Sequence, residues 1–78
     1  MNRKIRLIWD FYGETAQGTA THHVIHLEEF MVKENFEYHN KGTNSQSDNH
    51  VLAYITVNEK EVKIIRDALK PNRAFVEE

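Results

Sequence analysis

The sequence predicts a small α+β domain, a two-layer sandwich with the element order βαββαβ. Two observations lead to this prediction: four short segments have strand-like composition, and two other segments repeat apolar residues at the helical period. A chain of 78 residues forms one domain at most, which we assign to residues 1–78. Such a chain buries only about 60% of the surface that its unfolded form exposes, so its core is small.

The first strand is predicted at residues 4–12, where apolar side chains alternate with mostly polar ones at a period of two. One face of this strand consists of Ile5, Leu7, Trp9 and Phe11. The other face carries Ile8 and Tyr12 among charged residues. We therefore expect the second face to be more than a solvated surface.

A long helix follows, from Ala16 to about Glu34. Thr15 is the expected N-cap, because its hydroxyl can accept a hydrogen bond from an early helical N–H. With about 100° of rotation per residue, one arc of this helix is apolar and is expected to face the core. The arc consists of Ala16, Ala20, His23, Val24, Leu27, Phe30 and Met31.

Two more strands are predicted at residues 36–40 and 50–57. Residues 41–49 between them are predicted to form a mobile hairpin loop, because this stretch is polar throughout and has no apolar residue to anchor it. The later strand has one aliphatic face and one mixed face. The aliphatic face consists of Val51, Ala53, Ile55 and Val57, and the mixed face of His50, Leu52, Tyr54 and Thr56.

A second helix is predicted to begin after Asn58, which forms a capping-box pattern with Glu61. Pro71 ends this helix, because proline cannot continue the hydrogen-bond ladder. Its buried stripe consists of Val62, Ile65 and Leu69, flanked by Ile64 and Ala68. Residues 73–76 form the last predicted strand.

The commonest packed arrangement of these elements is the ferredoxin-like fold, a four-stranded antiparallel sheet with two helices on one face. It places the first and third strands in the centre, and these are the two most apolar strands. The shorter and more polar strands, 36–40 and 73–76, then lie at the edges of the sheet.

The sheet face opposite the helices is expected to be too apolar for a free surface, so we predict a homodimer formed through it. The candidate ligand or interface residues are Ile8, Asp10, Tyr12, Leu52 and Tyr54. The corresponding function is that of a non-catalytic module that binds a small ligand or another protein. The alternative is a monomer with scattered exposed hydrophobic residues, which are normal singly.

Composition excludes several classes of protein. Ten Lys and Arg against twelve Asp and Glu, with no basic block, argue against a nucleic-acid partner. The chain has no cysteine, which excludes disulfides and thiolate metal sites. Trp9 and Asp10 close the short apolar run near the N-terminus, so neither a signal peptide nor a membrane span is expected, and a cytoplasmic location follows as the default.

Three of the five histidines lie close together in the first helix. His22 and His26 are one turn apart and could share a divalent metal ion, with Glu29 as a third ligand. No other cofactor is expected. The competing interpretation is that His23 is a half-buried core residue with a hydrogen bond to the backbone or a neighbouring strand, while His22 and His26 are solvated.

An enzyme is the alternative function. Asp10, near the end of a central strand, with His23 or His26 as its partner, would supply an acid–base pair, and the helix that carries the histidines would be the centre of the site. The competing interpretation of Asp10 is a strand-end residue that accepts hydrogen bonds from the turn at residues 11–13.

Two segments carry a resemblance to a known family. They are Trp9-Asp10-Phe11-Tyr12-Gly13 and Thr19-Ala20-x-His22-His23-x-x-His26-Leu27-x-Glu29-Phe30. This pattern resembles an uncharacterised family of short bacterial proteins of ferredoxin-like fold. The resemblance covers the first half of the chain and implies a fold, but no function.

Overall fold

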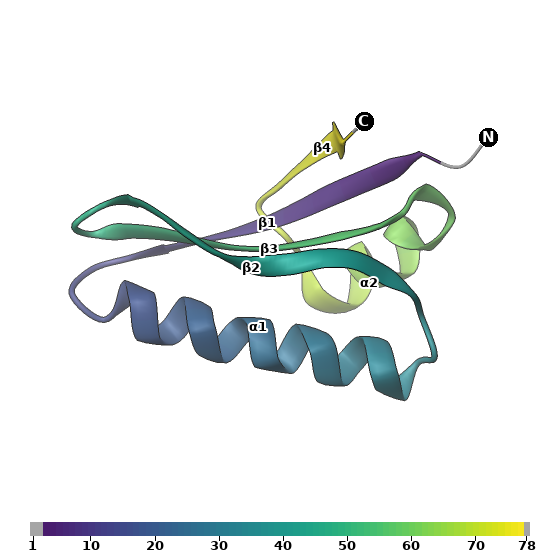
Figure 1. The fold of residues 1–78 in the computed structure, drawn as a ribbon, viewed down its shortest axis with the longest axis horizontal. Coiled ribbons are helices and arrows are strands. Elements are labelled where there is room, and N and C mark those ends of the chain that lie inside the picture. The colour runs from purple at the N-terminus through teal and green to yellow at the C-terminus, as the bar shows by residue number, and fades with distance from the viewer. Residues whose placement is uncertain (1–2, 78) are drawn as a thin grey trace.

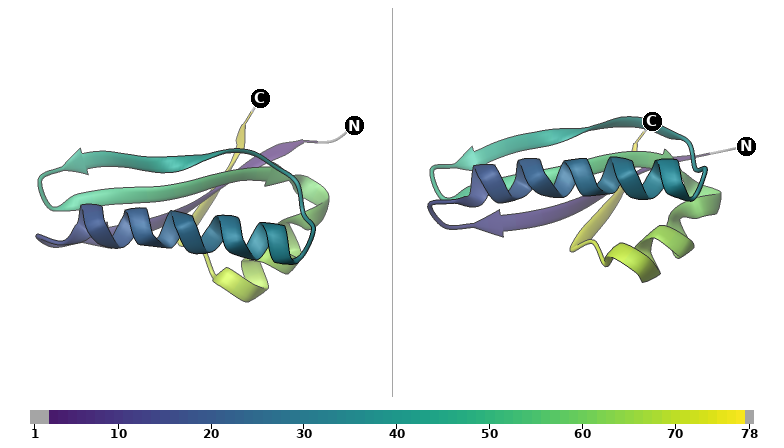
Figure 2. Two further views of the ribbon diagram at one scale, coloured as in Figure 1. Left: turned by 60° about the horizontal axis from the view of Figure 1, so that its bottom comes forward. Right: turned by 90° about the horizontal axis from the view of Figure 1, so that it is seen from below.

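The computed structural model of the protein describes residues 3–77 and is an α+β structure, with a four-stranded antiparallel sheet and two α-helices in that range. In chain order the elements are β1 (Lys4–Tyr12), α1 (Ala16–Lys33), β2 (Tyr38–Ser47), β3 (His50–Asn58), the 3₁₀ turn η1 (Glu59–Glu61), α2 (Val62–Leu69) and β4 (Arg73–Glu77). The strand order is β2-β3-β1-β4, and every neighbouring pair is antiparallel. Both helices lie on one side of the sheet (Figures 1 and 2).

The two central strands are β1 and β3, as predicted from their apolar composition. Their inward positions face each other in register, with Leu7 opposite Ile55 and Trp9 opposite Ala53. The α1 stripe covers these positions, and Ile65 is the fully buried contribution of α2. The core consists of Ile5, Leu7, Trp9, Ala16, Ala20, Val24, Leu27, Met31, Val51, Ala53, Ile55, Val57 and Ile65.

The loop predicted at 41–49 is much shorter in the structure. Residues 38–47 form β2, which pairs with β3 as far as Ser47 opposite His50, and only the two residues between the strands form the turn. Polar side chains are tolerated in β2 because β3 provides hydrogen-bond partners for its backbone. In addition, two β2 side chains that face the helices have polar partners on α1. Lys41 forms an ion pair with Glu28 at 2.9 Å, and the Gln17 amide donates to the Thr43 hydroxyl at 3.2 Å.

The helices begin close to their predicted positions without the predicted side-chain caps. Thr15 occupies the N-cap of α1, but its hydroxyl makes no capping hydrogen bond. Asn58 precedes the 3₁₀ turn η1 rather than an α-helix, and its side chain makes no capping hydrogen bond. Its side-chain oxygen instead lies 2.7 Å from the His39 ring nitrogen Nε2 on β2, so this asparagine joins β3 to the sheet edge.

β4 pairs with only the first half of β1, since the last partners are Ile8 and Arg73. Three hydrogen bonds hold the end of α2 and the segment that follows it against the middle of β1. The Asn72 backbone N–H donates to the Ile8 carbonyl at 2.8 Å. The Trp9 indole N–H donates to the Leu69 carbonyl at 2.8 Å, and the Asp10 backbone N–H donates to the Asn72 side-chain oxygen at 2.8 Å. These contacts bring the start of β4 next to Asp10.

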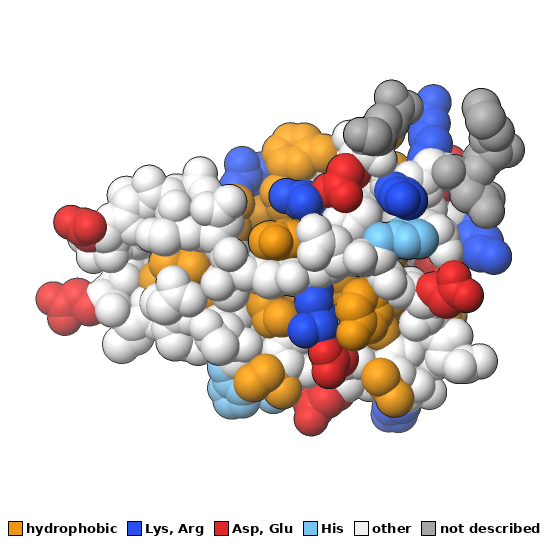
Figure 3. All heavy atoms as spheres, viewed as in Figure 1, with side chains coloured by type: hydrophobic (Ala, Val, Ile, Leu, Met, Phe, Trp, Pro, Cys, Tyr) orange, Lys and Arg blue, Asp and Glu red, His pale blue; other side chains and the backbone are white. Residues whose placement is uncertain are grey.

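No helix within residues 3–77 is long and apolar enough to span a membrane. On the side of the molecule shown in Figure 3, charged side chains of both signs are interspersed with separate groups of hydrophobic ones. That side therefore presents no broad patch of a single charge.

Candidate functional site

The candidate site is the sheet face turned away from the helices, which we call the open face. Its side chains alternate with those of the core along each strand, so strand register decides which of them meet. The open face consists of Arg6, Ile8, Asp10 and Tyr12 from β1, Asn40, Gly42 and Asn44 from β2, His50, Leu52, Tyr54 and Thr56 from β3, and Arg73, Phe75 and Glu77 from β4.

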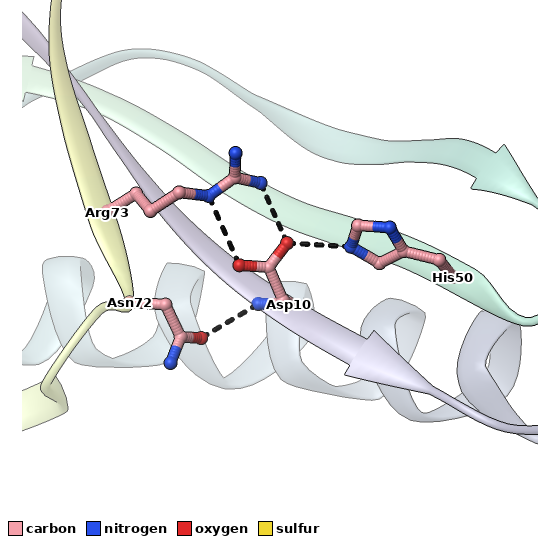
Figure 4. Close-up of polar contacts among 4 residues, drawn as sticks. All are labelled: Asp10, His50, Asn72 and Arg73. Carbon is pink, nitrogen blue, oxygen red and sulfur yellow. Dashed lines mark hydrogen bonds and ion pairs between the residues drawn. The ribbon is translucent and has the colours of Figure 1, made fainter.

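A network of charged and polar side chains centres on Asp10 (Figure 4). The Arg73 guanidinium makes a two-pronged contact with this carboxylate, with Nη2 donating to Oδ1 at 2.7 Å and Nε donating to Oδ2 at 3.2 Å. The His50 ring nitrogen Nε2 also lies 2.7 Å from Asp10 Oδ1. Asp10 thus connects β1 to β3 on one side and to β4 on the other.

The carboxyl group of Asp10 is largely enclosed, with 12% of its side chain exposed. Burial raises the pKa of Asp10, but the hydrogen bonds from His50 and Arg73 and the charge of Arg73 together lower it by more. The net direction is a pKa below the usual range of an aspartic acid. Asp10 is therefore a carboxylate at neutral pH and holds its two partners as an anion.

The contact with Asp10 also orients the imidazole of His50. The ring of Tyr12 stacks on it, with centroids 4.4 Å apart and planes 14° from parallel. When His50 is neutral and donates to Asp10 through Nε2, its second nitrogen Nδ1 is left as an acceptor. A carboxylate that orients a histidine in this way can position an imidazole to accept a proton or a hydrogen bond.

A second polar cluster covers the other end of the open face. The Arg6 Nε lies 2.7 Å from Glu77 Oε2, in an ion pair whose N–H is not aligned for a hydrogen bond. The Arg6 guanidinium also lies over the Tyr54 ring, 4.3 Å from its centroid, in a cation–π contact. The hydroxyl of the buried Thr56 donates to Glu77 at 3.3 Å.

The structure distributes the five predicted interface residues over different environments. Ile8 is already buried within the chain, with 3% of its surface exposed, whereas Tyr12 is 71% exposed. Leu52 and Tyr54 are half-buried. Asp10 is engaged in the network described above, so only part of the predicted set remains accessible.

The two candidate metal ligands of α1 are close together, as their spacing predicts. The rings of His22 and His26 have centroids 4.5 Å apart in an edge-on arrangement, and both residues are exposed. Glu29 is also exposed on this helix. Within residues 3–77, no group of three or more histidines and acidic residues is arranged to hold a metal ion.

His23 is half-buried, and its ring packs against two aromatic side chains of β1. The ring centroids lie 4.9 Å from Trp9 and 5.4 Å from Phe11. Among the described residues 3–77, the buried ring nitrogen Nε2 has no hydrogen-bond partner, so the expected hydrogen bond to the backbone or a strand is missing at this atom. Burial, assisted by the nearby His26, lowers the pKa of His23, which favours the neutral imidazole.

The acid–base pair of Asp10 with a helix histidine is not formed. His23 contacts Trp9 and Phe11, which point toward the helices, whereas Asp10 lies between them and points to the open face. Asp10 is paired with His50 and Arg73 instead. It also does not accept hydrogen bonds from the turn that follows β1, since Gly13 donates to the Asn49 carbonyl.

The sequence analysis placed His50 on the mixed face of its strand but did not pair it with Asp10, and it placed none of Arg73, Phe75 and Glu77 on the open face. His50 and Asp10 share a face once β1 and β3 are taken as antiparallel neighbours, so alternation alone was a usable signal. Arg73 and Phe75 require the register of β4, which no sequence pattern fixes.

The fold and this face define the class of the chain: a small α+β protein with one sheet face covered by helices and the other uncovered. Comparisons with protein-family models, with curated proteins and with solved structures returned no match for this chain.

Proposed function

We propose that the protein is a non-catalytic interaction module that forms a homodimer through the open face. The observation that carries this proposal is an uncovered sheet face on which two large aromatic side chains remain accessible. Tyr12 is 71% exposed and Phe75 is 50% exposed, and the half-buried Tyr54 and Leu52 lie between them on the same face. Sheets stack face to face in just this way, about 10 Å apart.

The charges of the open face support the choice of a second copy as the partner. Arg73 is paired with Asp10, and Arg6 with Glu77, all within one chain. Burying an unpaired charge strongly opposes association, whereas charges that already have partners cost less to cover. A second copy, which presents the same paired set, can approach without leaving a charge unmatched.

We also propose that the fold is of the ferredoxin-like type. Read from the other edge, the strand order is β4-β1-β3-β2, with the first and third strands in the centre and each helix between strands that are not sheet neighbours. The proposed location is cytoplasmic, which rests on the composition of the sequence alone.

Sedimentation velocity of the wild-type protein and two variants tests the homodimer. Tyr12→Asp and Phe75→Asp each place a charge at an exposed position of the open face, so we expect both variants to sediment as monomers and the wild type as a dimer. Circular dichroism of each variant verifies that the fold is retained. Ile8→Asp is unsuitable, because Ile8 is buried within the chain and a charge there would unfold it.

Val32→Asp is the matched control. Val32 is 72% exposed on α1, so the substitution introduces the same charge at an equally accessible hydrophobic residue away from the open face. We expect this variant to remain a dimer. A wild-type protein that is monomeric at high micromolar concentration, or a control variant that dissociates while the open-face variants do not, would refute the proposal.

A further inference from the structure

The outer surface of α1 carries a pair of imidazoles that the proposed dimer does not use. We propose that His22 and His26 form a binding site for a divalent transition-metal ion of the kind that prefers nitrogen ligands, such as Zn²⁺. The two side chains come from consecutive turns of one helix, four residues apart, which places them on the same surface. The site belongs to a single chain and does not depend on dimerisation.

The separation of the two rings is close to the one that a shared metal requires. Zinc binds a histidine nitrogen at about 2.0–2.1 Å, so two imidazoles on one tetrahedral ion have ring centroids roughly 5 Å apart. The centroids of His22 and His26 are 4.5 Å apart. The distance between the two rings is therefore compatible with one ion bound by a nitrogen of each ring.

Both imidazoles are available to a metal ion. The hydrogen bonds of histidine side chains within residues 3–77 belong to His39 and His50, and both members of the α1 pair are exposed. Binding of an ion to these rings would therefore break none of the hydrogen bonds found within residues 3–77. The competing polar contacts that usually hold a surface histidine in one orientation are missing at this pair.

The chemistry of the two ligands selects the class of ion. Imidazole suits zinc, copper and nickel, whereas magnesium and calcium prefer oxygen ligands. Glu29 lies one turn beyond His26 on the exposed side of α1 and is the nearest acidic residue of that surface in sequence. The remaining coordination positions are open to water, which leaves an ion at this site able to accept a further ligand.

The site lies on the opposite side of the molecule from the open face. The helices cover one face of the sheet (Figure 1). The strand register places the residues proposed for the dimer on the other face. The outward surface of α1 is thus separated from Tyr12 and Phe75 by the helix and the sheet. A test of metal binding and a test of dimerisation can succeed or fail independently.

Isothermal titration calorimetry with Zn²⁺ alone, in a non-chelating buffer, tests this site. We expect binding near neutral pH with a stoichiometry of one ion per chain, and weaker binding in acid, because protons compete with the metal ion for its ligands. His22→Ala and His26→Ala should each weaken binding by about tenfold or more, since loss of even an outer-shell partner costs roughly 10–100-fold in metal affinity. Alanine is a strong helix former, so α1 is retained in both variants.

His39→Ala is the matched control, because it removes an exposed histidine from β2 and should leave zinc affinity unchanged. Mg²⁺ in place of Zn²⁺ should give no heat of binding. Absence of zinc binding by the wild type overturns the proposal. So does binding that persists in both the His22 and His26 variants, because the ion is then held elsewhere on the chain.

Discussion

We predict that His23 makes the stability of this protein sensitive to mild acid. Its ring nitrogen Nε2 is buried without a hydrogen-bond partner, and its pKa is lowered by burial and by the nearby His26. A buried polar group without a partner costs about 1–3 kcal/mol of stability. Because this residue is only half-buried, we expect His23→Phe to stabilise the fold by about 1 kcal/mol at pH 7, with the contacts to Trp9 and Phe11 retained as aromatic pairs.

The sign of the pH dependence follows from the direction of the pKa shift. The unfolded chain takes up a proton on His23 near the ordinary histidine pKa of about 6.5, whereas the folded protein takes it up only at lower pH. Folding therefore loses stability as the pH falls below about 6.5, by at most about 1.4 kcal/mol per pH unit, until the lower pKa of the folded state is reached. His23→Phe abolishes this loss.

Urea unfolding followed by circular dichroism, at several pH values between 7.5 and 5 in metal-free buffer, measures the effect. The difference in unfolding free energy between His23→Phe and the wild type should grow as the pH falls. His22→Phe is the control, because His22 is exposed and its substitution removes no buried polar nitrogen. The difference in unfolding free energy between this variant and the wild type should not grow in the same way. For His23→Phe, a difference that stays constant with pH would show that His23 titrates alike in the folded and unfolded chains and would refute the reasoning.

Two further substitutions test local features of the fold. Asp10→Asn should destabilise the protein by about 1–2 kcal/mol at pH 7, because His50 and Arg73 lose the anion that they contact. The expected loss is no larger than this because Arg73 is partly exposed, and solvent screens its charge. Because the pKa of Asp10 is lowered, this contribution to stability is present above about pH 4 and is lost as the pH falls further. The urea unfolding curves of the variant and the wild type should therefore converge in acid. Equal stability of the two proteins at pH 7 would contradict this prediction. Lys70→Gly should raise the unfolding temperature, with a gain of about 0.5–1 kcal/mol in the free energy of unfolding. Lys70 ends α2 in the left-handed conformation, with φ of 48°, which glycine adopts more readily than lysine. An unchanged or lower unfolding temperature would argue that the lysine is unstrained there.

The elements with strong hydrophobic periodicity could be predicted from the sequence. β1 spans the predicted residues, and the buried face of α1 matches the predicted arc. β2 could not be predicted in the same way, because its second half contains no apolar residue. It forms a strand because β3 offers a complete backbone ladder and because Lys41 and Thr43 find partners on α1, and both are tertiary effects that the composition of 41–47 does not reveal.

The candidate site shows the same division between local and tertiary information. The pattern of alternation correctly placed Asp10, Tyr12 and Tyr54 on the face opposite the core. The same alternation explains why Asp10 does not contact His23. Trp9 and Phe11, the neighbours of Asp10 in β1, face α1, so Asp10 points to the opposite face. The proposed pairing of Asp10 with the helix ignored that alternation, whereas its actual partner His50 lies on the same face of the adjacent strand.

The size of the open face limits the dimer that it can form. Four strands about 4.8 Å apart, with a central strand of 9 residues rising about 3.3 Å each, give a face of roughly 19 by 30 Å. A standard stable interface takes about 800 Å² from each partner, which is roughly 15% of the 5214 Å² accessible surface of this chain. Nearly the whole face would have to be covered, including Arg6 and Arg73 with their partners. Because such polar contacts add little net affinity, Tyr12 and Phe75 must contribute most of the binding free energy, and we expect the dimer to dissociate in the micromolar rather than the nanomolar range.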